Sequence, residues 1–131
     1  MMTLYDSSVV IDYLDGVPEA VEYVEEHAGG RAVAPPLVLF EVYQGEVFRA
    51  RQADFDAVDA AIEWLHVIDV SVDHARAAAT LQDELQQRGV PLSARDAFVA
   101  GTAKAAGDRL VVADADFDVP GLDDLLQVEI L

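Results

Sequence analysis

Hydrophobic positions along the chain follow two patterns that alternate. Short runs rich in Val, Ile and Leu predict β-strands near residues 2–6, 31–36, 66–71, 109–114 and 125–131. Between them lie amphipathic stretches, most of which begin with Pro or Ser or end with Gly. These stretches predict α-helices within residues 7–16, 18–30, 36–50, 53–65, 72–89 and 92–107.

Strands that alternate with helices usually pair in parallel, with helices covering both faces of the sheet. We therefore expect an α/β protein with three layers, α/β/α, around a central parallel sheet. The sequence has no internal repeat and no long linker, which predicts a single domain over residues 1–131. Sites in such sheets form beyond the carboxyl ends of the strands, so acidic residues at those ends are candidate site residues.

Composition narrows the class of protein. The chain has no Cys, which excludes disulfides and thiolate metal sites and favours a cytoplasmic location. It has no apolar stretch near the roughly 18 residues of a membrane span, and no membrane partner is expected. The net charge is −17, with a single Lys. An acidic, Lys-poor folded domain is typical of a halophilic protein, whose self-repulsion salt screens.

Two acidic residues follow predicted strands. Asp6 comes after the first strand, where it is also a natural N-cap for the next helix. Asp114 ends the strand in "RLVVAD" and begins "DADFD", in which Asp116 is a secondary candidate. An EF-hand loop beginning at Asp114 would need Gly and Glu where the chain has Val119 and Leu125, which excludes that type of calcium site.

Two further acidic residues lie on helices. Asp96 is in the first turn of a helix with Ser93 as a plausible N-cap, so a capping role and a site role are both open. Glu41 is the one charged residue of "LVLFEVYQ", a segment whose apolar positions almost surround the helix and predict burial. A buried carboxylate needs a partner. That partner is a metal ion, an Arg side chain or a dimer interface.

Together the four acidic residues predict one pocket, and carboxylates so close together repel each other unless cations neutralise them. Without Cys, an all-oxygen site selects a hard cation, Mg²⁺ or Mn²⁺. The chemistry expected of such a site is phosphodiester hydrolysis.

Four segments resemble the PIN-domain family, in particular the VapC toxins of toxin–antitoxin systems: "TLYDSSVVIDYLDG", "PPLVLFEVYQG", "PLSARDAFVAGTAKAAG" and "RLVVADADFD". The resemblance implies a PIN-like fold and an endoribonuclease that needs Mg²⁺ or Mn²⁺. It also implies RNA as substrate, homodimerisation and inhibition by a small antitoxin. The family's acidic cluster maps onto Asp6, Glu41, Asp96 and Asp114. The resemblance implies that Asp6, Asp96 and Asp114 hold the cation, with Asp116 as a possible extra metal ligand, and that Glu41 binds a second cation or orients the attacking water.

Some features depart from this pattern. Val112 stands where the family often has Thr or Ser, and few basic residues are present to bind RNA phosphates. Arg95, Lys104 and Ser8 are the candidates for contacts with the substrate. A housekeeping RNA-processing nuclease and a catalytically silent PIN-like binding module remain alternatives. A receiver-like phosphoacceptor domain is excluded, because the only Lys is in a helix and no acidic pair follows the first strand.

Overall fold

The computed structural model describes residues 2–49 and 51–131. Its centre is a five-stranded sheet in which every strand pairs in parallel with its neighbours, in the order β3-β2-β1-β4-β5. The strands are β1 (Thr3–Tyr5), β2 (Ala32–Ala34), β3 (Leu65–Val67), β4 (Arg109–Val112) and β5 (Val128–Ile130). The parallel sheet expected from the alternating pattern is thereby confirmed.

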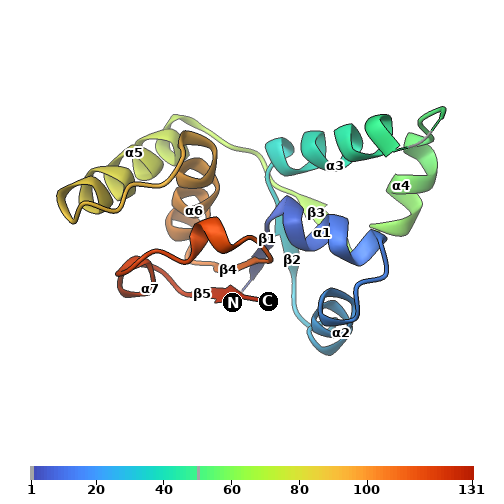
Figure 1. Cartoon of the computed structure of the whole chain (residues 1–131), viewed down its shortest axis with the longest axis horizontal. Coiled ribbons are helices and arrows are strands. Elements are labelled where there is room, and N and C mark those ends of the chain that lie inside the picture. The colour runs from blue at the N-terminus through green and yellow to red at the C-terminus, as the bar shows by residue number, and fades with distance from the viewer. Residues whose placement is uncertain (1, 50) are drawn as a thin grey trace.

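Helices cover both faces of the sheet, as Figure 1 shows. One layer contains α1 (Ser7–Leu14), α2 (Pro18–Glu26), α3 (Pro36–Arg49) and α4 (Phe55–Ala61). The other contains α5 (Val72–Gln87), α6 (Ala94–Ala106), the 3₁₀ helix η1 (Ala115–Phe117) and α7 (Leu122–Leu125). Right-handed crossovers produce this division, because the chain steps from β1 to β3 in one direction and then returns past β1 to β4 and β5. The predicted three-layer α/β/α architecture is confirmed.

From β1 the chain adds β2 and β3 on one side of the sheet, and it adds β4 and β5 on the other side. The order of the strands therefore reverses between the neighbours β1 and β4. Open parallel sheets bind ligands at such a point, beyond the carboxyl ends of the strands. The backbone N–H of Asp6, just after β1, donates to the carbonyl oxygen of Val111 in β4 at 3.0 Å. The sheet therefore brings the ends of β1 and β4 together, and with them the residues that follow each strand.

The expectation that residues 37–44 are largely buried is wrong. Only Val38 and Val42 of α3 are fully buried, whereas Phe40 is 58% exposed and Phe48, further along the helix, is 80% exposed. The reason is geometric: α3 packs against α1 and α4, which together cover only one side of it. Apolar residues surround the helix in the sequence, but no element among the described residues covers its outer side.

The predicted strand at residues 125–131 is also only partly correct. Val128–Ile130, in its second half, forms β5, while Leu125 ends α7, which follows Gly121 at φ 89°. Acidic residues in the first turn suit the positive end of that short helix. The third predicted helix extends to Ala50, which lies outside the described residues. Of the helices described, none is long and apolar enough to cross a membrane.

Candidate metal centre

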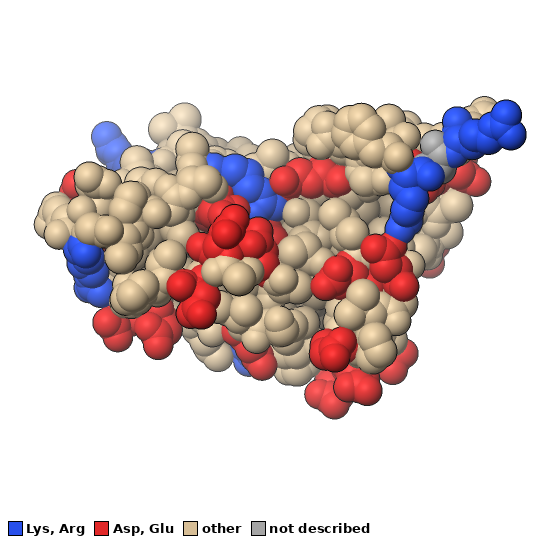
Figure 2. Space-filling model, in the orientation of Figure 1, with Lys and Arg blue, Asp and Glu red and all other residues tan. Residues whose placement is uncertain are grey.

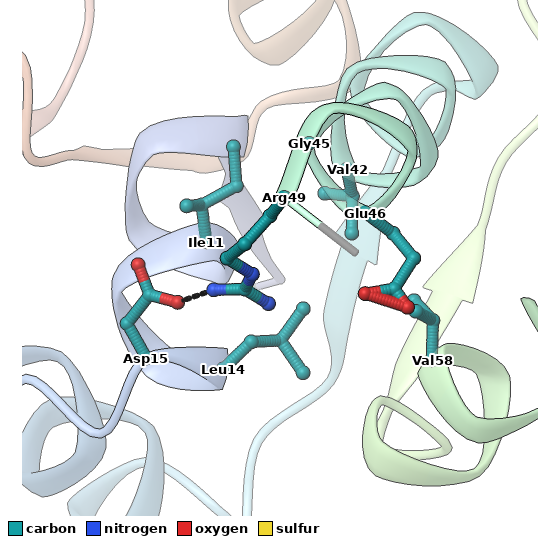
Figure 3. A pocket seen from close by; sticks show the side chains of 8 residues that line it. All are labelled: Ile11, Leu14, Asp15, Val42, Gly45, Glu46, Arg49 and Val58. Carbon is teal, nitrogen blue, oxygen red and sulfur yellow. Dashed lines mark hydrogen bonds and ion pairs between the residues drawn. The ribbon is translucent and has the colours of Figure 1, made fainter. Parts of the chain in front are cut away.

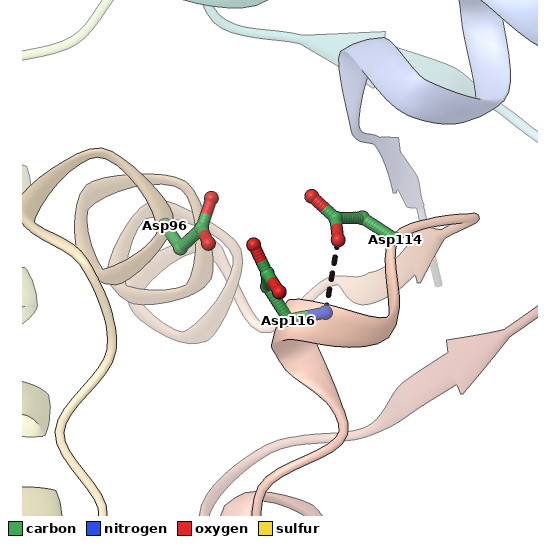
Figure 4. A group of neighbouring side chains, drawn as sticks. All are labelled: Asp96, Asp114 and Asp116. Atoms are coloured by element: carbon green, nitrogen blue, oxygen red, sulfur yellow. Dashed lines mark hydrogen bonds between the residues drawn. The ribbon is translucent and has the colours of Figure 1, made fainter.

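Three carboxylates meet beyond the carboxyl end of β4. One oxygen from each of Asp96, Asp114 and Asp116 lies within 4.8 Å of the other two. Figure 4 shows the three side chains pointing toward a common space, with Asp96 coming from α6 and the other two from the loop after β4 and from η1. Asp96 is buried, Asp114 is half-buried and Asp116 is exposed, so the group opens from the interior to the surface.

Local hydrogen bonds fix these three side chains. The Ser93 hydroxyl accepts from the backbone N–H of Asp96 at 3.1 Å, which confirms Ser93 as the N-cap of α6. The Asp96 carboxylate turns away from the cap and accepts from Arg95. Asp114 Oδ1 accepts from the backbone N–H of Asp116 at 2.9 Å, which holds the loop in a tight turn. The N-terminus of α6 adds a positive dipole end beside the Asp96 charge.

Asp6 is the most deeply buried of the acidic residues, at 1% exposure. Its Oδ2 accepts from the backbone N–H of Ser8 at 3.2 Å and from the Ser8 hydroxyl at 2.5 Å, so it does cap α1. Its Oδ1 accepts no hydrogen bond of good geometry from the described residues. That oxygen instead lies 2.6 Å from Nη1 of Arg95, in an ion pair.

Arg95 reaches three carboxylates at once. Its Nη1 lies 2.9 Å from Asp96 Oδ1, and its Nε donates to both oxygens of Glu41 at 3.0 Å. Nη2 donates to the Ser7 hydroxyl at 2.8 Å and pairs closely with Glu41 as well. Burial acts to lower the pKa of Arg95, but hydrogen bonding to Glu41 and the charge of Asp6 outweigh it and raise that pKa above its ordinary value. The guanidinium is permanently charged.

Glu41 therefore faces Arg95. The resemblance implied that Glu41 faces the metal ion, whereas the residues alone also allowed an Arg partner; in the structure its partner is Arg95. The Ser7 hydroxyl donates to the same carboxylate at 3.2 Å. Sequence reasoning placed Arg95 among the substrate contacts and missed its ion pairs. The sequence did indicate that the Glu41 carboxylate needs a cationic partner. It did not indicate that the partner is Arg95, because the two residues are 54 positions apart.

The remaining candidates lie around or away from the cluster. The Ser8 hydroxyl joins Asp6 to the end of β4, because it also accepts from the backbone N–H of Ala113 at 2.9 Å. Val112 is fully buried in β4. Lys104 is in the last turn of α6 and lines a separate hollow with Asp73 and Arg76, so the structure does not bring it to the carboxylates.

The surface around the cluster is predominantly acidic. Figure 2 shows Asp and Glu side chains gathered near the centre of the view, around η1, with a basic side chain directly beside them. Oxygen ligands of this kind suit Mg²⁺ or Mn²⁺. The three converging carboxylates fit such an ion, because a bound cation would offset the repulsion between like charges this close together.

A comparison with protein families matches the PIN domain to residues 3–121. Solved structures with the same fold include VapBC from Salmonella typhimurium bound to DNA, at 18% identity and a TM-score of 0.79, covering 99% of this chain and 98% of that one. VapBC2 from Rickettsia felis, bound to a DNA fragment from its promoter, has 20% identity, a TM-score of 0.78 and the same coverage.

VapBC-5 from Mycobacterium tuberculosis, a member of the VapBC family of toxin–antitoxin systems, is 26% identical, with a TM-score of 0.65 over 99% of this chain and 97% of that one. No curated protein sequence matches the chain significantly.

Proposed function

The chain belongs to the PIN domain family, and on that premise we propose that it is a metal-dependent endoribonuclease, the toxin of a toxin–antitoxin pair. The observation that supports this proposal is the convergence of Asp96, Asp114 and Asp116 within 4.8 Å at the carboxyl edge of the sheet. The reaction is hydrolysis of RNA phosphodiester bonds in the cytoplasm. Structural likeness to VapBC complexes supports the toxin assignment over a housekeeping nuclease.

The cofactor in this proposal is Mg²⁺ or Mn²⁺. Asp96, Asp114 and Asp116 would hold it. When bound, such an ion polarises a phosphate and activates water as a nucleophile. Asp6 and Glu41 pair with Arg95 and hold it beside the Asp96 carboxylate. The acidic surface repels RNA. Binding of the RNA phosphates therefore depends on the positive charges at the site itself.

The test is RNA cleavage in Mn²⁺ by the purified protein and its Asp96→Asn variant. We expect the substitution to lower the cleavage rate by about a hundredfold or more, because it removes a proposed ligand of the ion that would stabilise charge on the phosphate. Asp118→Asn is the matched control: Asp118 is exposed in the same acidic loop and outside the three-carboxylate group, and its loss should leave the rate unchanged. Equal rates for Asp96→Asn and the parent protein would rule the assignment out.

The proposal includes two partners, a small antitoxin and a second copy of the chain. A hollow of about 120 Å³ between α1, α3 and α4 is lined by Ile11, Leu14, Val42 and Val58, with Arg49 paired to Asp15 across it (Figure 3). This groove suits an apolar antitoxin segment, and the net charge of −17 favours a basic one. The exposed Phe40, Val47 and Phe48 of α3 suit the second copy.

Expression in a bacterial host covers the toxin part of the same proposal. The parent protein should arrest growth, Asp96→Asn should not, and co-expression of a small cognate antitoxin should relieve the arrest. A protein that neither cleaves RNA nor arrests growth, but folds normally, would instead be the silent binding module.

A further inference from the structure

Arg95 divides the acidic residues into two halves. The inner half, Asp6 and Glu41, contacts the guanidinium directly. The outer half, Asp114 and Asp116, has no contact with Arg95 among the described residues. Asp96 belongs to both halves, because one of its oxygens pairs with Arg95 at 2.9 Å and its carboxylate is also part of the 4.8 Å group.

The inner half is built around the guanidinium. Oδ1 of Asp6, on a side chain that is 1% exposed, has Nη1 of Arg95 at 2.6 Å as its one charged partner among the described residues. Glu41 receives a two-point contact from the same side chain, because Nε donates to Oε2 and Nη2 donates to Oε1. The planar fork of Arg matches this geometry, and Lys does not provide it. Three carboxylates therefore share one cation that belongs to the chain.

A second divalent ion in the inner half would meet that cation. Entry would require Asp6 and Glu41 to release Arg95, and it would place two further positive charges beside the guanidinium. In the outer half, Asp114 and Asp116 form no ion pair with a basic side chain among the described residues, and they converge with Asp96 on a common space (Figure 4).

We propose that Arg95 takes the place of a second metal ion, so that the protein binds one divalent ion, at Asp96, Asp114 and Asp116, while the guanidinium neutralises Asp6 and Glu41. This inference rests on the metal site of the proposed function and names how many ions that site takes. Arg95 is a positioning residue: it holds Asp96 on one side and keeps the inner carboxylates from competing for the ion.

The experiment counts bound Mn²⁺ from the loss of the free-ion signal in electron paramagnetic resonance, with no RNA present. The parent protein should bind one Mn²⁺. Arg95→Met should bind two, because removal of the guanidinium opens the inner carboxylates to a second ion. Arg88→Met is the matched control: it removes one positive charge and one exposed ion pair, with Asp124, and should still bind one. Two ions in the parent protein, or an unchanged count in Arg95→Met, would overturn the proposal.

Glu41→Gln and Asp114→Asn provide a second measurement that does not require Arg95→Met to fold. Glu41 is held by Arg95 in the proposal and is no ligand, so Glu41→Gln should leave the Mn²⁺ dissociation constant within about threefold of the parent value, whereas Asp114→Asn should raise it by at least about tenfold. Equal losses in the two variants would make Glu41 a ligand and contradict the proposal.

The outcomes separate this inference from the nuclease function. One Mn²⁺ in the parent and two in Arg95→Met, without RNA cleavage by the parent, would support the role of Arg95 and refute the nuclease. Two Mn²⁺ in a parent protein that cleaves RNA would support the nuclease function and refute the role of Arg95. No Mn²⁺ in either protein would refute both the metal site and the role given to Arg95.

Discussion

At the scale of single residues, the Ser8 hydroxyl joins the two strands that form the site. It donates to Asp6 Oδ2 at 2.5 Å and accepts from the backbone N–H of Ala113 at 2.9 Å. Both groups lie beyond the ends of strands, where the sheet no longer supplies hydrogen bonds. A single oxygen atom thus satisfies a buried carboxylate after β1 and a backbone donor after β4.

Replacing Ser8 by Ala tests this role. The change leaves two polar groups without their partner, and we expect it to lower the free energy of unfolding by about 1–3 kcal/mol. Urea denaturation followed by circular dichroism measures the loss. Thr80→Ala is the control, because the Thr80 hydroxyl is exposed and bonds only within its own helix, to the carbonyl of Arg76. If Ser8→Ala lowers the free energy of unfolding no more than Thr80→Ala does, the Ser8 hydroxyl does not stabilise the fold.

At the scale of elements, α5 and α6 approach each other unusually closely through Gly101. A Cβ built on Gly101 would lie 2.2 Å from Cα of Ala78, in the backbone of α5. The helices cross at this contact between two small residues, and Asp96 lies in the first turn of the same helix α6. The spacing of the two helices thus positions one of the three converging carboxylates.

Gly101→Ala should therefore destabilise the protein by about 1–3 kcal/mol, since the added methyl group forces the two backbones apart. Gly45→Ala is its matched control within α3. Its added Cβ would meet only Cδ1 of Ile11, at 3.9 Å, and Ala favours a helix over Gly by up to about 1 kcal/mol. Thermal unfolding should show a lower melting temperature for Gly101→Ala and a higher one for Gly45→Ala. A higher melting temperature in both variants would contradict the role given to the Gly101 contact.

At the scale of the whole molecule, the sequence predicted the α/β layers because each element carries its own periodic signal. It also predicted that Asp6, Asp96 and Asp114 lie at one edge of the sheet, because strand ends and a helix start meet there in a parallel sheet; that they form the catalytic site stays a prediction. The exposure of Phe40 was not predictable, since it depends on which side of α3 the neighbouring helices cover.

The ion pairs of Arg95 could not be predicted from the sequence either. An Arg side chain has several rotatable bonds, and its choice among RNA, solvent and three carboxylates depends on distances that only the folded chain sets. Position along the chain placed Arg95 next to Asp96, but gave no indication that its fork turns inward to Glu41.

The charge of the whole molecule leads to a prediction of its own. With 25 acidic side chains against 8 Lys and Arg, the folded chain repels itself, and the repulsion weakens as the Debye length falls from about 10 Å at 0.1 M salt to about 3 Å at 1 M. We expect the melting temperature to rise between these two KCl concentrations, by about 4 °C for each kcal/mol of repulsion that is screened. Scanning calorimetry without divalent ions measures the rise, and KCl avoids the stronger effect of sulfate on apolar burial. A melting temperature that stays constant or falls across this range would mean that the acidic surface is already neutralised within the fold, as the inner carboxylates are by Arg95.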